Sequence, residues 1–144
     1  MLLGEHRHTL DSKKRLSLPS KFRKELGKKI ILTRGFDGSL LIYSLKEWEK
    51  LREKLQNLSL GQSDARAFAR HLFGGASEIE IDSAGRILVP DFLKEYAELE
   101  QGVIVVGLAD KVELWSEERW ENYQKALREK SDLIAEKLGS VGMI

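Results

Sequence analysis

The sequence predicts an α+β fold in which two copies of a β-β-α-β-β module pair into one closed, pseudo-twofold β-core with helices at its periphery. The first observation behind this prediction is an internal repeat, since residues 11–19 and 82–90 both read D-S-x-x-R-apolar-x-apolar-P. The second is that later features recur in the same order about 72 residues apart, as Trp48 and Trp120 do. A duplicated small module is therefore expected.

Each module is predicted to begin with a β-hairpin. Alternating or apolar runs rich in β-formers flank the D-S-x-x-R segments, at residues 5–10 and 15–18 in the first copy and 78–81 and 86–89 in the second. The D-S-x-x-R segment would then form the tip of each hairpin.

A short helix and a second pair of strands are expected to complete each module. Pro19 and Pro90 precede short amphipathic stretches, which predicts helices over 19–26 and 90–99. The following strands are expected at residues 30–34, 40–43, 103–107 and 112–115. Four short strands cannot cover their own apolar faces or protect their edges, so the two copies are expected to pair with each other.

Longer helices are expected after each module. Ser44 and Glu47 form a capping box that starts one helix, and an amphipathic stretch over 63–73 predicts another. The glycine-rich last segment, 139–144, is expected to fray. The predicted division is a first module over 5–48, linking helices over 49–76, a second module over 77–120, and a C-terminal helix and tail over 121–144.

The composition excludes several classes of protein. The chain has no cysteine, which leaves no disulfide framework, thiolate metal site or cysteine nucleophile. No apolar stretch is long enough for a signal peptide or a membrane span, so a cytoplasmic protein without a membrane partner is expected. The net charge is only +1, but residues 1–36 hold ten lysines and arginines against three acids. Positive charge is thus concentrated in the first module.

The tip of the first hairpin is the candidate nucleic-acid site. Lys13, Lys14 and Arg15, with Arg7 on the preceding strand, place positive charge on a ribbon narrow enough to enter a DNA groove. Such side chains neutralise phosphates, and Arg15 could read a guanine edge through its bidentate fork. Arg86 is the equivalent arginine of the second tip, which is less basic and is expected to contribute less.

The aspartates of the two tips are expected to stabilise the turns. Asp11 and Asp82 suit this role because a carboxylate can accept hydrogen bonds from turn amides, whereas it repels DNA phosphates. Arg15 and Arg86 could pair with these acids and so serve structure instead of binding. For the arginines, the two roles remain open from the residues alone.

Other polar residues point to no chemistry. His6 and His8 alternate on a predicted strand and share one face, but no third ligand is near in sequence, so no metal is predicted. Motifs for nucleophiles, phosphate loops or paired catalytic carboxylates are absent, so no enzymatic activity, cofactor or small-molecule substrate is predicted. The cations of the first short helix, Arg23 among them, are expected to act mostly as a background field.

The duplicated hairpin motif, residues 16–23, residues 73–76 and residues 85–90 together resemble the MraZ family over nearly the whole chain. Each module is similar to the SpoVT/AbrB type of DNA-binding domain, which implies an AbrB-like swapped-hairpin core. The resemblance implies a nucleoid-associated transcription regulator, usually a repressor. Such a regulator would bind repeated short promoter boxes upstream of an operon for cell division and cell-wall synthesis.

The resemblance also implies partners and site residues. The partners are double-stranded DNA and further copies of the chain in a ring-shaped homo-oligomer, whose hairpins would engage successive repeats through avidity. The family's hairpin arginines carry over to Arg15 and Arg86, with Lys13 and Lys14 as phosphate contacts and Arg7 as a further candidate.

One residue departs from the family motif. Lys14 stands before the arginine where the motif has glycine, as Gly85 does in the second copy. A side chain at a positive φ is strained, so either the first turn changes type or lysine tolerates mild strain there.

Three other functions fit parts of the sequence. A ring-forming interaction scaffold without specific DNA binding would use its charges for subunit contacts and would associate independently of salt. A toxin-neutralising partner would share the hairpin, but it normally has one copy and a disordered tail. A metal enzyme would need His6 and His8 to bind an ion.

Overall fold

A six-stranded antiparallel sheet forms the centre of the α+β fold in the computed structural model, which describes residues 1–144. Its strands are, in spatial order, β1 (Leu2–Thr9), β7 (Gly102–Ala109), β8 (Val112–Ser116), β4 (Leu40–Ser44), β3 (Lys29–Arg34) and β5 (Ser77–Glu80). The two remaining strands, β2 (Arg15–Ser17) and β6 (Arg86–Leu88), pair only with each other and form a separate short ribbon.

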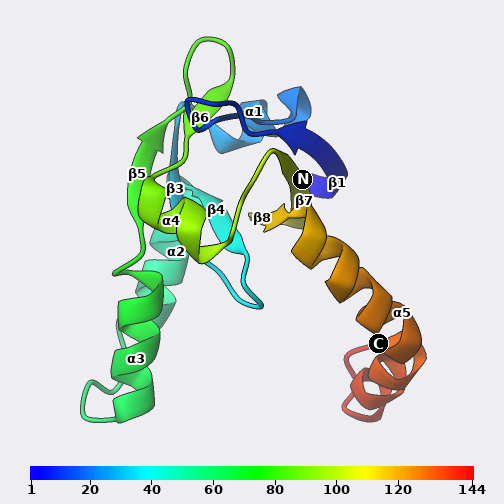
Figure 1. Ribbon diagram of the computed structural model, residues 1–144. Coiled ribbons are helices and arrows are strands. Elements are labelled where there is room, and N and C mark those ends of the chain that lie inside the picture. Colours follow the sequence, from blue (N-terminus) through cyan, green and yellow to red (C-terminus); the bar gives the residue numbers. More distant parts are fainter.

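Five helices surround the sheet. They are α1 (Ser20–Leu26), α2 (Leu45–Leu55), α3 (Ser63–Leu72), α4 (Asp91–Tyr96) and α5 (Glu117–Ser140). Figure 1 shows α3 and α5 projecting from the same side of the sheet as two separate arms, with α1 and the β2–β6 ribbon at the opposite end. None of these helices combines the length and apolar character that crossing a membrane requires.

The strand pairing differs from the hairpins predicted within each copy. β1 pairs along its whole length with β7 of the second copy, and β5 pairs with β3 of the first. Only the bridge between Leu10 and Leu16 remains of the first predicted hairpin. Each of the eight residues of β1 pairs with a residue of β7. β2 has only three residues, so pairing with β2 would leave most backbone groups of β1 without a partner.

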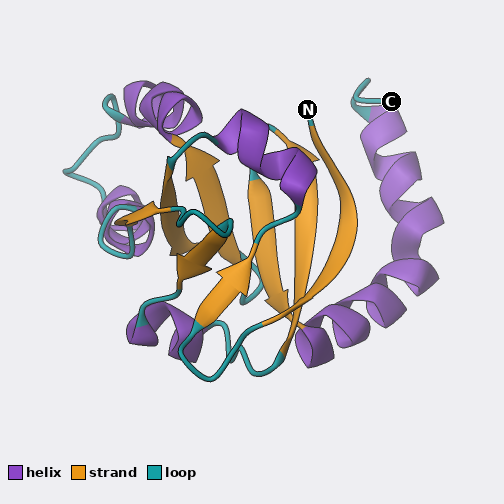
Figure 2. Ribbon diagram, turned by 90° about the horizontal axis from the view of Figure 1, so that it is seen from above, coloured by secondary structure: helices purple, strands orange, loops and turns teal.

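The predicted closure of the β-core is wrong. β1 and β5 are the two edges of an open sheet and do not pair with each other. One face of the sheet is instead covered by the β2–β6 ribbon with α1 and α4, whose buried side chains include Leu16, Ile87, Phe22 and Leu93. A cluster of 19 buried residues forms there, so the core is completed by side-chain packing and not by strand pairing. Figure 2 shows a short helix crossing this face of the sheet.

The helical arms cover the other face of the sheet. Helices α2 and α3 pack over Ile31 and Tyr43 through residues that include Trp48 and Phe68. Helix α5 packs over β7 and β8 through Trp120, which lies against the buried Trp115. Each arm therefore rests on its own half of the sheet.

The start of the segment expected to fray is helical. Helix α5 continues through Ser140, and the backbone amides of Gly142 and Met143 donate to the carbonyls of Gly139 and Leu138. Gly142 has a φ of +76°, the left-handed conformation that lets the chain turn back and cap the C-terminal end of the helix.

Candidate nucleic-acid interface

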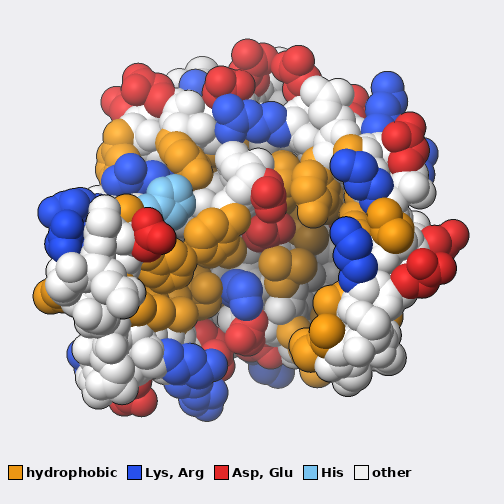
Figure 3. Space-filling view, turned by 90° about the horizontal axis from the view of Figure 1, so that it is seen from below, with side chains coloured by type: hydrophobic (Ala, Val, Ile, Leu, Met, Phe, Trp, Pro, Cys, Tyr) orange, Lys and Arg blue, Asp and Glu red, His pale blue; other side chains and the backbone are white.

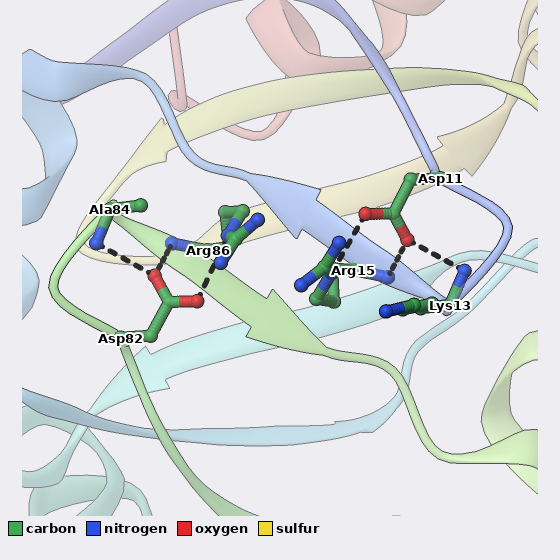
Figure 4. Close-up of polar contacts among 6 residues, drawn as sticks. All are labelled: Asp11, Lys13, Arg15, Asp82, Ala84 and Arg86. Atoms are coloured by element: carbon green, nitrogen blue, oxygen red, sulfur yellow. Dashed lines mark hydrogen bonds and ion pairs between the residues drawn. The ribbon is translucent and has the colours of Figure 1, made fainter.

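The first turn, residues 11–15, is organised by the carboxylate of Asp11. Its Oδ1 accepts hydrogen bonds from the backbone amides of Lys13 (2.8 Å) and Arg15 (2.9 Å), and its Oδ2 accepts one from Nε of Arg15 (2.8 Å). These contacts are drawn in Figure 4. They lower the pKa of Asp11, chiefly through the amide of Arg15. The carboxylate therefore fixes both the turn and the direction of the Arg15 side chain.

The second turn, residues 82–86, repeats this network. Oδ1 of Asp82 accepts from the amides of Ala84 and Arg86, each at 2.9 Å, and Oδ2 accepts from Nε of Arg86 at 2.9 Å (Figure 4). The pKa of Asp82 is lowered in the same way, first by the amide of Arg86. The repeated sequence motif thus corresponds to a repeated set of hydrogen bonds.

Both arginines keep donors available for a ligand. The side chains of Arg15 and Arg86 are 34% and 33% exposed, and each uses Nε for its aspartate. Their terminal nitrogens make no hydrogen bond within the protein. An arginine held through one nitrogen can present the rest of its planar fork in a defined direction.

The two arginines share the outward face of the β2–β6 ribbon. Arg15 lies opposite Leu88 and Ser17 lies opposite Arg86, while the central pair, Leu16 and Ile87, is buried in the core. Because side chains alternate along a strand, the outward-facing residues are Arg15, Ser17, Arg86 and Leu88. The two turns lie at opposite ends of this ribbon, since Leu18 donates to the Gly85 carbonyl and Val89 donates to the Lys14 carbonyl.

The lysines of the first turn differ in their contacts. Lys14 adopts a φ of +62° and Gly85 a φ of +79°, so lysine tolerates the left-handed conformation and the turn keeps its type. The ammonium of Lys14 pairs with Asp91 at the start of α4. Lys13 is exposed and makes no ion pair, so its charge faces solvent.

Arg7 lies apart from the ribbon. It is on β1, opposite Ile104 of β7, and its guanidinium pairs with Glu117 and, at 3.7 Å, with Glu121. Both acids belong to the first turns of α5. The structure therefore brings together Lys13, Lys14, Arg15 and Arg86 but not Arg7.

The histidines of β1 have local contacts. The His6 ring packs edge-on against Phe22 with ring centroids 5.1 Å apart. Burial lowers the pKa of His8, although a backbone hydrogen bond with Ser17 opposes the shift. No group of three possible metal ligands exists anywhere in residues 1–144.

Sequence reasoning assigned Arg23 to a background field and did not predict its contact with the second turn. Arg23 is on α1 of the first module, yet its guanidinium lies against Gly85 of the second turn. Its Nε donates to the carbonyl of Leu18 at 3.0 Å. Nothing in the local sequence of either copy indicates this contact, because it joins one module to the other.

Comparison with known proteins agrees with the repeated architecture. A family model described as "MraZ protein, putative antitoxin-like" matches residues 1–71 and again residues 72–138. A protein of Caldanaerobacter subterraneus subsp. tengcongensis is 49% identical over 96% of this chain and 96% of its own length. One of Caldicellulosiruptor saccharolyticus is 49% identical over 99% of this chain and all of its own. Both are named transcriptional regulator MraZ, which denotes a regulator and not an enzyme. By this similarity over nearly its full length, the chain belongs to the MraZ family.

Proposed function

We propose that this protein is a transcription regulator that binds specific sequences in double-stranded DNA. Its sites would be repeated short promoter boxes upstream of an operon for cell division and cell-wall synthesis, where it would act as a repressor within the nucleoid. The observation that carries the proposal is the outward face of the β2–β6 ribbon, on which two arginines are oriented by matching aspartates.

The ribbon suits the major groove. A two-stranded β-ribbon fits that groove, and an arginine fork can donate to O6 and N7 of guanine. We assign this role to Arg15 and Arg86, with Asp11 and Asp82 stabilising the turns and orienting the arginines. Contacts to phosphate position a protein on DNA without reading sequence.

The remaining cations are assigned by their partners. Lys13, whose ammonium forms no ion pair, is the stronger phosphate contact, and Lys14 would have to leave or share Asp91. Arg7 is the weakest candidate, because Glu117 and Glu121 already neutralise its charge and would repel phosphate.

We further propose that the core is a swapped, pseudo-twofold pair of modules. Support comes from the strand pairs β1–β7 and β5–β3, each of which joins one copy to the other. The division into 5–48, 49–76, 77–120 and 121–144 then describes sequence repeats within one folding unit. In an isolated module, β1 or β5 would lose the strand with which it pairs and would be left unpaired.

Self-association into a ring is also proposed. Figure 3 shows hydrophobic side chains gathered on the face between the helical arms. Large apolar residues exposed near this part of the fold or along α5 include Phe36, Tyr123, Leu133, Ile134 and Leu138. Exposed apolar patches of this kind mark interaction surfaces. A ring would carry several ribbons, so modest single contacts would add up through effective concentration.

The same apolar surface favours the alternative function, a ring-forming scaffold that does not bind specific DNA. The two functions are separated by DNA binding itself. Wild type and Arg15→Ala should be titrated with promoter DNA that contains several short repeats, and with scrambled DNA, over a range of salt concentrations.

We expect wild type to prefer the repeats and to lose affinity steeply with salt. Arg15→Ala should weaken repeat binding about tenfold or more, since one bidentate arginine–guanine pair contributes about 1–3 kcal/mol. Arg52→Ala is the matched control, because Arg52 pairs with Glu49 on helix α2. Binding without repeat preference, or an Arg15→Ala variant equal to wild type, would favour the scaffold.

A further inference from the structure

The second turn has few positive charges of its own. Where the first turn has Lys13 and Lys14, the second has Ala84 and Gly85, and only Arg86 remains. If both ends of the ribbon approach the DNA backbone, the second end lacks the phosphate contacts that lysines provide at the first.

Arg23 of the first module lies where that charge is missing. A Cβ built on Gly85 would overlap the Arg23 guanidinium, so the guanidinium lies directly on the turn. Leu18 joins the two, because its amide donates to the Gly85 carbonyl (3.0 Å) and its carbonyl accepts from Nε of Arg23 (3.0 Å). Gly85 is thus the residue that leaves space for the arginine.

Arg23, like Lys13, has no acidic partner, whereas the other cations of the ribbon do. Lys14, Arg15 and Arg86 each form an ion pair with a carboxylate, whereas the guanidinium of Arg23 forms none. The side chain is partly buried, and its terminal nitrogens make no hydrogen bond within the protein. A partly buried charge without a counter-ion is unfavourable, so an anion bound there would be stabilised.

We propose that Arg23 is a further DNA-binding residue, whose guanidinium binds a backbone phosphate beside the second turn. It supplies across the module boundary the positive charge that this turn lacks. The inference rests on the proposed function, and it extends the binding surface to α1. Both ends of the ribbon then carry phosphate-binding cations, one set from the turn itself and one from the neighbouring module.

The test compares Arg23→Gln with Lys24→Gln on promoter DNA with repeats and on scrambled DNA, across salt. Lys24 is the adjacent residue, it is exposed on the same helix, and its substitution removes the same charge. Arg23→Gln should bind both DNAs about tenfold more weakly, with the slope of log affinity against log salt reduced by about one. Lys24→Gln should change the slope by less than half as much.

Arg23→Lys separates binding from a structural role. It retains the charge, so it should keep most of the salt slope even where its thermal midpoint falls with that of Arg23→Gln. The inference would be overturned if Arg23→Gln had the salt slope of wild type, or if its affinity and salt slope equalled those of Lys24→Gln. If wild type binds repeats and Arg15→Ala weakens that binding, this result leaves the proposed function intact. If wild type binds no DNA, both fall together.

Discussion

The two turns of the ribbon share one hydrogen-bond network and differ in the residue before the arginine. Asp11 and Asp82 make equivalent contacts. The residue before the arginine has a positive φ in both turns, Lys14 in the first and Gly85 in the second. Lysine is accommodated at the first turn, where its side chain reaches Asp91. At the second turn, Arg23 occupies the space that a side chain would need. The comparison indicates that a side chain at the second turn is disfavoured mainly by backbone conformation and would also displace the Arg23 guanidinium.

The largest expected effect is that of Gly85→Ala. The left-handed backbone disfavours a side chain by about 1–2 kcal/mol, and the new methyl must also displace Arg23. We therefore expect the free energy of unfolding to fall by about 1–2 kcal/mol, measured by urea denaturation. Combining Gly85→Ala with Arg23→Ala should restore part of the loss. Strict additivity of the two substitutions would contradict the packing explanation.

The aspartates should behave alike despite this difference. Their pKa values are lowered in the folded protein, so each stabilises the fold above the unfolded value of about 3.9. That contribution is lost as the pH falls through the lower, folded pKa. Asp11→Asn and Asp82→Asn should each reduce stability at neutral pH and flatten its decline below about pH 4. Urea unfolding at a series of pH values tests this, and unequal effects would show that the networks are not equivalent.

A smaller effect is expected from Lys14→Gly, which makes the first turn like the second. Relief of backbone strain favours the variant, while greater freedom of the unfolded chain and the lost ion pair with Asp91 oppose it. The free energy of unfolding should change by less than about 1 kcal/mol. Asp91→Asn is the control that removes the ion pair alone. A fall in the free energy of unfolding as large as that of Gly85→Ala would mean that the Lys14 side chain stabilises the fold by more than its ion pair with Asp91.

Sequence reasoning predicted the elements better than their pairing. The repeat located both turns, and the helix expected over 19–26 is found at Ser20–Leu26. The predicted partner of β1 was wrong. A β-rich run followed by a turn predicts pairing with the next strand in the sequence, whereas β7 is about 100 residues away. The length of β7 and its buried side chains decide that pairing.

The candidate site shows the same limit. Local motifs predicted that Arg15 and Arg86 could pair with their aspartates, since the contacts of each turn span at most four residues. Arg23 could not be identified in this way, because its contact with Gly85 exists only after the modules pack. Arg7 was included for its charge, although its acidic partners on α5 lie 110 or more positions away in the sequence.

Arg7→Ala is therefore expected to have the smallest effect on DNA binding. The guanidinium is held by Glu117 and Glu121 on α5 and does not lie on the ribbon. Its removal therefore takes away no direct DNA contact, and because salt screens the lost charge, affinity for promoter repeats should change less than about twofold. The matched variant is Arg23→Ala, which removes an arginine without an acidic partner. Titration of both on the same DNA at one salt concentration ranks them. A larger loss for Arg7→Ala would place the DNA along β1 and the start of α5 instead of on the ribbon, because only direct contact could overcome the repulsion of those two carboxylates.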